Sequence, residues 1–268
     1  MFMRLLVMVL VGISLAACST VPITGRSQLN LIPGSSMLSM SLQQYDQFLK
    51  ERKVSSNQEQ TATVKRVGAN VQRAVERYFE SSGFGQHLND YKWEFNLVED
   101  KQVNAWCMPG GKVVVYTGIL PVAKSDAGLA VVMGHEIAHA IAEHGNERMS
   151  QGLLTQMGGV ALSTALSTKT AATQQLWMSV YGVGAQYGAI LPYGRMQESE
   201  ADHLGLIFMA MAGYDPNEAV PFWERMAAQK GGQAPPEFLS THPSDATRIA
   251  NIRRLIPEVE QKYGSQRQ

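Results

Sequence analysis

Residues 129–139 read Leu-Ala-Val-Val-Met-Gly-His-Glu-Ile-Ala-His, a run without proline that is predicted to form a helix. Residues four apart on a helix lie on the same face, so the imidazoles of His135 and His139 can bind one Zn²⁺ ion. Glu136 lies beside the first histidine, where its carboxylate can take a proton from a metal-bound water without binding the metal. This pattern is typical of a catalytic zinc site. The alternative is a solvated helix face with two incidental histidines.

A third metal ligand must come from another segment, because no histidine follows six residues after His139. Residues 195–202 read Arg-Met-Gln-Glu-Ser-Glu-Ala-Asp and offer carboxylates on a second predicted helix. Glu198 and Asp202 are four apart and share a face, so one can bind zinc while the other orients a ligand imidazole. The spacing alone also fits an acidic face exposed to solvent.

The N-terminus is typical of an exported lipoprotein. Residues 1–17 have a short basic start and an apolar run too short to span a bilayer, as expected of a signal peptide. The string Leu-Ala-Ala-Cys that ends at Cys18 resembles the lipobox of bacterial lipoproteins, which predicts a lipidated N-terminal cysteine. Residues 18–34 are rich in Pro, Gly, Ser and Thr and are expected to form a tether after that cysteine. The alternative is an ordinary signal peptide that ends near a cysteine.

Serine, not aspartate, follows Cys18, and this favours sorting to the periplasmic face of a bacterial outer membrane. Acylation of Cys18 would leave Cys107 as the second of two cysteines without an internal disulfide partner, and we expect it to pack within a strand. The formal net charge is zero, which argues against a nucleic-acid partner because such proteins carry a clustered basic excess. Hydrophobic residues make up 45% of the 268 residues, enough for a sizeable core.

Hydrophobic periodicity divides the chain into helices and a few short strands. The expected elements are helices at 35–50 and 58–79 and strands at 91–98, 103–108 and 112–116. The sequence Pro-Gly-Gly at 109–111 indicates a hairpin between the last two strands, and the chain after residue 117 is predicted to be helical. The predicted fold is therefore mainly α with a small antiparallel β-sheet (α+β).

Residues 151–194 are unusual because Lys169 is their only charged residue. One interpretation is a transmembrane hairpin, and the other is a pair of helices that are buried or graze a membrane. The segment has no uninterrupted apolar stretch of the length that a membrane-spanning helix needs, which favours the second interpretation.

Together these segments resemble the gluzincin metallopeptidase family that includes HtpX, the CAAX prenyl protease and the mitochondrial Oma protease (peptidase family M48). The family signature is His-Glu-x-x-His followed by Glu-x-x-Ala-Asp. The resemblance implies one Zn²⁺ per chain, with His135, His139 and Glu198 as the metal ligands. It implies that Glu136 is the general base and that Asp202 is a carboxylate behind the ligands.

Further segments match the same family. Asn104 and Ala105, followed by the predicted hairpin, resemble its substrate-binding edge strand. His242 and Arg248 resemble its C-terminal catalytic motif, in which they help hold the substrate oxyanion or the zinc-ligand carboxylate. A second hypothesis for His242 is that it occupies the open position on zinc in a resting state. Glu200 falls at a variable position of the signature and is not expected to bind zinc.

The resemblance covers most of residues 60–253 and implies a zincin-like helical metalloprotease domain, which we expect to extend over residues 35–268. With its lipobox, the chain is similar to the periplasmic lipoprotein members, of which LoiP is one. We therefore expect a zinc-dependent endopeptidase that cleaves misfolded or misassembled cell-envelope proteins, with polypeptide substrates and the outer-membrane protein assembly machinery as partners. The alternative is a lipid-anchored chaperone or outer-membrane assembly factor with a structural zinc site. An open metal position beside a general base argues against that alternative.

Overall fold

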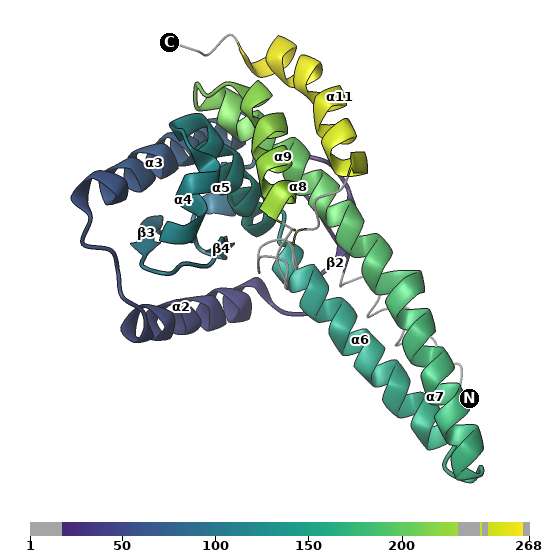
Figure 1. Cartoon of the computed structure of the whole chain (residues 1–268). Coiled ribbons are helices and arrows are strands. Elements are labelled where there is room, and N and C mark those ends of the chain that lie inside the picture. The colour runs from purple at the N-terminus through teal and green to yellow at the C-terminus, as the bar shows by residue number, and fades with distance from the viewer. Residues whose placement is uncertain (1–17, 230–241, 243–245, 265–268) are drawn as a thin grey trace. The chain divides into compact units, whose positions relative to one another are not determined.

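The computed structural model describes residues 18–229, residue 242 and residues 246–264, and these residues form two compact units (Figure 1). The smaller unit consists of residues 18–37 and 143–197, and the larger unit of residues 38–142 together with the described residues from 198 onward. The predicted fold class, mainly α with a small sheet, is confirmed. The sequence predicted a single peptidase domain over 35–268, whereas the chain within this range passes from one unit to the other and back.

The larger unit contains most of the helices and the three-stranded sheet. Its helices are most of α2 (Gly34–Glu51), α3 (Gln58–Ser81), α4 (Leu120–Ala123), α5 (Asp126–Ile141), the C-terminal part of α8 (Leu191–Met211), α9 (Ala219–Ala228) and α11 (Ala246–Tyr263). Its strands are β3 (Glu94–Val98), β4 (Ala105–Met108) and β5 (Lys112–Tyr116). Short 3-10 turns lie at Gly85–Leu88, Thr117–Ile119 and Pro216–Glu218. The two N-terminal helices match their predicted bounds within two residues at each end.

Helix α5 lies at the centre of this unit. The hydroxyl of Ser125 accepts a hydrogen bond from the Gly128 N–H at 3.1 Å and caps the N-terminus of the helix. Nearly every residue from Gly128 to Ile141 is buried, because α3, α9 and β4 pack against α5 on different sides. A helix enclosed in this way must be apolar all round, which explains why the run before the first histidine has no charged residue.

The sheet has the strand order β3-β5-β4. Strands β4 and β5 form the predicted antiparallel hairpin, in which Ala105 pairs with Val115, and Gly110 and Gly111 form the turn at positive φ angles of 86° and 79°. Strand β3 instead pairs parallel to β5, so the sheet is mixed and not purely antiparallel. Because β5 is central and buried, β4 is an edge strand among the described residues, and it packs against α5.

The smaller unit consists of a helical hairpin and a two-stranded sheet. It contains β1 (Cys18–Thr20), β2 (Ser27–Leu29), α6 (His144–Ala165), α7 (Ala171–Ala185), a π-helical turn (Gln186–Ile190) and the first part of α8. Strand β2 contacts α6, and the guanidinium of Arg26 forms two hydrogen bonds with the Glu147 carboxylate at 2.8 and 2.9 Å. The predicted tether over 18–34 is therefore partly folded onto α6.

Helices α6 and α7 run antiparallel and cover most of the charge-poor segment 151–194. Large apolar side chains on both helices are exposed, so the segment is not a buried helix pair. The other form of that interpretation, a pair of helices that graze a membrane, stays a prediction. Among the described residues no helix has the length and apolar character needed to cross a bilayer.

Candidate metal centre

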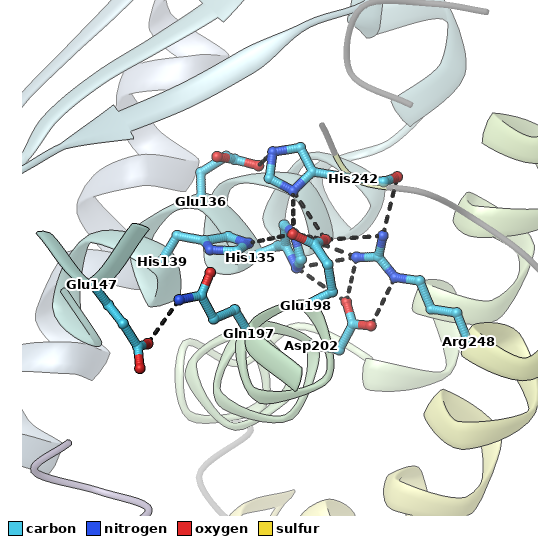
Figure 2. A network of polar contacts seen from close by, with 9 residues as sticks. All are labelled: His135, Glu136, His139, Glu147, Gln197, Glu198, Asp202, His242 and Arg248. Atoms are coloured by element: carbon cyan, nitrogen blue, oxygen red, sulfur yellow. Dashed lines mark hydrogen bonds and ion pairs between the residues drawn. The ribbon is translucent and has the colours of Figure 1, made fainter. Parts of the chain in front are cut away.

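The two histidines of α5 come together as their spacing predicted. Their Nε2 atoms lie 3.1 Å apart, and the exposed fractions of His135 and His139 are 1% and 5%. Glu198 of α8 lies opposite them, with carboxylate oxygens 3.4 Å from His135 Nε2 and 3.3 Å from His139 Nε2 (Figure 2). The centre is therefore built by two helices, α5 and α8, that are separated by residues 142–190 of the chain.

A pair of glycines lets α5 and α8 approach so closely. A Cβ atom added at Gly205 would lie 2.9 Å from the backbone nitrogen of His135, and one added at Gly134 would lie 3.0 Å from the Gly205 carbonyl. The first distance is shorter than real Cβ contacts and the second is shorter than nearly all of them, so larger residues here would push the helices apart. This contact was not predicted from the sequence. The glycine directly before the first histidine, and the glycine three residues after Asp202, were its only sequence signals.

His242 completes a buried group of four candidate ligands. One ligand atom from each of His135, His139, Glu198 and His242 can be chosen so that all lie within 4.8 Å of one another. His242 Nδ1 is 3.2 Å from His135 Nε2 and 3.0 Å from both Glu198 carboxylate oxygens. Figure 2 shows the four side chains pointing toward a common point.

The donor set and its spacing fit zinc. A tetrahedral zinc ion with ligands at about 2.0–2.1 Å keeps the ligand atoms about 3.3 Å from each other. Five nitrogen–nitrogen and nitrogen–oxygen distances in this group lie between 3.0 and 3.4 Å. Three imidazoles and one carboxylate are also donors that zinc prefers. The described residues of this centre therefore fit one zinc ion.

The protonation states of two ligands suit a cation. Burial alone would raise the pKa of the Glu198 carboxyl, but hydrogen bonds from the three surrounding histidines outweigh it and hold that pKa far below its usual value. Burial lowers the pKa of His139 well below the usual value for an imidazole. An ionised carboxylate and a neutral imidazole are the forms that bind zinc.

Asp202 and Arg248 lie behind the ligands and fix their orientation. The Asp202 carboxylate is 3.0 Å from His135 Nδ1, which leaves the Nε2 atom of that ring to face the centre. Arg248 donates to both oxygens of Asp202 at 2.8 and 2.7 Å and lies 3.3 Å from the Glu198 carboxylate. Of the two predicted roles of Arg248, this geometry favours holding the ligand carboxylate.

Trp223 was not predicted as part of the centre. It lies on α9 with an exposed fraction of 1%. The guanidinium carbon of Arg248 lies 3.5 Å from the centroid of the Trp223 ring. The same ring packs edge-on against His135 with a centroid distance of 5.5 Å. Trp223 therefore supports both the arginine and one ligand. A tryptophan in an apolar helix gives no sequence signal that separates this role from ordinary core packing.

Glu136 lies between the centre and the edge strand. It is 4% exposed, and its carboxylate is 3.6 Å from His242 Nε2. Burial, and then the charge of Glu136, raise the pKa of the Cys107 thiol well above its usual value. This places Glu136 near β4, which carries Cys107, and keeps the thiol protonated, in agreement with the prediction that Cys107 packs within a strand.

The remaining residues that were singled out in the sequence do not belong to the group of four candidate ligands. Asn104 and Ala105 lie at the start of β4, where the Asn104 carbonyl accepts a hydrogen bond from the Tyr116 N–H at 3.1 Å. Glu200 is on α8 but does not belong to the candidate metal ligands. Cys18 is the first residue of β1.

Two ligand histidines on one buried helix, and a ligand glutamate four residues before an aspartate on a second, define a zincin-type metallopeptidase site. The chain belongs to peptidase family M48, whose sequence model matches residues 65–256. It is similar to the mitochondrial metalloendopeptidase OMA1 of Schizosaccharomyces pombe, with 39% identity over 197 residues, which cover 72% of this chain and 54% of that protein.

Two further relatives extend this comparison. Human metalloendopeptidase OMA1 is 30% identical over 244 residues, which cover 88% of this chain and 45% of the human protein. The beta-barrel assembly-enhancing protease of Yersinia pestis is 30% identical over 172 residues, covering 63% of this chain and 35% of that protein. The chain thus spans about half the length of these relatives or less.

Proposed function

We propose that this chain is a zinc-dependent endopeptidase that cleaves polypeptides at the His135, His139 and Glu198 centre. The observation that carries the proposal is the buried group of candidate ligands with a carboxylate, Glu136, next to it that is not itself a member of the group. A purely structural zinc site is usually closed and rich in thiolates, whereas this one has an adjacent general base and no cysteine ligand.

The remaining residues have defined tasks in this proposal. Zinc, when bound, polarises the scissile carbonyl and makes water a better nucleophile near neutral pH. Edge strand β4, which begins at Ala105 directly after Asn104, can bind an extended peptide by backbone hydrogen bonds. Glu136 accepts the proton of the attacking water and delivers it to the leaving amine. Asp202 and Arg248 hold His135 and Glu198 in place throughout.

Removing the metal tests the proposal against the chaperone alternative. Purified protein should cleave casein, a chelator should stop the cleavage, and added zinc should restore it while far-UV circular dichroism stays unchanged. The fold should persist because the larger unit has its own apolar core apart from the ligands. Unfolding on chelation, with no casein cleavage before it, would instead indicate a structural zinc site and a non-enzymatic role.

We infer that the described arrangement is a resting state in which His242 takes the fourth ligand position. Its Nδ1 atom is as close to Glu198 as the two α5 histidines are, so it would compete with water for the metal. Replacing His242 by alanine should therefore raise the rate of casein cleavage several-fold, because no side chain would then compete with water for the fourth position on the metal. A rate that falls below that of the original protein would favour the other hypothesis, in which His242 stabilises the substrate oxyanion.

We propose that the protein is anchored by acylated Cys18 on the periplasmic face of the outer membrane and acts on misfolded or misassembled envelope proteins. The lipobox and Ser19 support the location. An edge strand that binds backbone suits unfolded substrates, and one relative is named as a protease that enhances β-barrel assembly. Mass spectrometry of the mature protein should show acyl chains on Cys18. An unmodified N-terminus upstream or downstream of this residue would contradict the anchor.

A further inference from the structure

Exposed apolar side chains are concentrated on one part of the smaller unit. Of the large hydrophobic residues that are exposed in the described chain, all but Val54 and Phe84 lie on α6, α7, the π-helical turn or the start of α8. We name these residues the hairpin surface: Met149, Leu153, Leu154, Met157, Val160, Leu176, Trp177, Val180, Val183, Tyr187, Ile190, Leu191 and Tyr193. So many exposed large apolar side chains on neighbouring elements indicate a surface that another molecule covers.

The helices of this hairpin do not bury these side chains between themselves. Two glycines of α6, Gly158 and Gly159, face the Tyr181 side chain of α7, and the Tyr181 hydroxyl donates to the Thr155 carbonyl at 2.7 Å. No residue of α7 is buried, and Leu176 and Trp177 keep exposed fractions of 62% and 50%. Small residues on one side of a helix–helix contact, with other large side chains turned outward, are common in helix pairs in lipid.

Three hydroxyl groups of the hairpin are hydrogen-bonded within their own helix, as they would be in lipid. The hydroxyls of Thr155, Thr164 and Ser179 each donate to the backbone carbonyl four residues earlier, at 2.9, 2.9 and 2.8 Å. These groups therefore need no partner outside the helix. Trp177 on α7 and Tyr187 in the π-helical turn are exposed, and such amphipathic rings favour the headgroup region of a bilayer.

Charge distinguishes a lipid partner from a protein partner. Protein interfaces are enriched in arginine and surrounded by a polar rim, whereas Lys169, in the turn between α6 and α7, is the only charged residue within 151–194. Hydrocarbon accepts no charge, and a single lysine in the turn can remain at the phosphates. We propose that the hairpin surface enters the boundary between headgroups and acyl chains of a phospholipid bilayer without crossing it.

The depth of this insertion is limited by the helices themselves. No described helix is both long and apolar enough to span the hydrocarbon core, so the contact is interfacial. Strand β1 of the same unit begins at Cys18. An acyl chain on this cysteine would hold the smaller unit at the same bilayer, but the hairpin surface stands on its own observations and does not depend on peptidase activity.

Quenching of Trp177 by spin-labelled lipids tests the proposal. The full chain is reconstituted into vesicles of phosphatidylethanolamine and phosphatidylglycerol, with or without a phospholipid that carries a nitroxide near the headgroup end of its acyl chain. Trp177 is one of four tryptophans, so its fluorescence is obtained by subtracting the emission of the Trp177→Phe variant from that of the original protein. We expect this difference to be largely lost when the nitroxide is present and to move to shorter wavelength on reconstitution.

Two matched charge variants give the control. Val180→Glu places a carboxylate on the hairpin surface, and Gln175→Glu places one on an exposed site of α7 outside it. Val180→Glu should abolish the quenching of Trp177 with unchanged circular dichroism and casein cleavage, whereas Gln175→Glu should keep it. Equal Trp177 emission with and without nitroxide would overturn the proposal, and would be the result if a second copy or another protein covers the surface. Equal quenching in the two charge variants would overturn it as well.

Discussion

We expect glutamine in place of Glu136 to lower the rate of peptide cleavage by about 10²–10⁴-fold and to leave zinc bound. The carboxylate is 4% exposed and lies outside the group of four candidate ligands, so its loss removes a proton acceptor and not a metal ligand. An amide of the same size keeps the packing beside β4 but cannot take up the proton. The measurement is kcat on an internally quenched peptide, together with zinc content by atomic emission.

The zinc content is the control for this variant. If Glu136→Gln loses zinc as well as activity, then Glu136 binds or supports the metal and its role as general base is wrong. If the variant keeps both zinc and full turnover, proton transfer depends on another group and the hydrolytic mechanism fails. Only loss of kcat with zinc retained agrees with the proposed division of tasks among the residues of α5.

We expect glutamine in place of Glu198 to lower the affinity for zinc by more than about a hundredfold, because even loss of a residue behind the ligands costs about 10–100-fold in such sites. Glu198 supplies the charge that neutralises zinc, and both of its oxygens face ligand nitrogens at 3.0–3.4 Å. A neutral amide is a poorer donor to zinc. The measurement is competition for zinc with a chromophoric chelator, with thermal unfolding of the metal-free proteins as a check on the fold.

Glu200→Gln is the matched control for that experiment. It makes the same chemical change two residues away on α8, at a buried carboxylate that is not one of the candidate ligands. The account requires zinc affinity close to that of the original protein for Glu200→Gln. If the two variants lose zinc equally, a general change in the charge of α8 and not ligation by Glu198 explains the loss.

Local patterns predicted the parts of this centre that depend on a single helix. Helical spacing alone brings His135 and His139 to one face, and the same spacing relates Glu198 to Asp202. The hairpin of β4 and β5 followed from the glycines of its turn. Spacing within one helix could not predict that residues of α5 and α8 form one site. The match to the signature of a family predicted it.

The parts that depend on tertiary contact could not be predicted. Nothing local shows that Gly134 faces Gly205, or that Trp223 stacks on Arg248, since both contacts join segments far apart in the chain. The same reason applies to the parallel pairing of β3 with β5, which skips the intervening strand. Folding of residues 18–29 onto α6 was also missed, because turn-forming residues describe a tether and a small hairpin equally well.

Anomalous diffraction at the zinc absorption edge, from crystals of the protein as purified, tests the central claim most directly. The account predicts one strong peak per chain, bonded to Nε2 of His135, Nε2 of His139 and a carboxylate oxygen of Glu198, with Nδ1 of His242 as the fourth ligand in the resting state. A peak bonded to other side chains, or no peak at this group in zinc-soaked crystals, would contradict it.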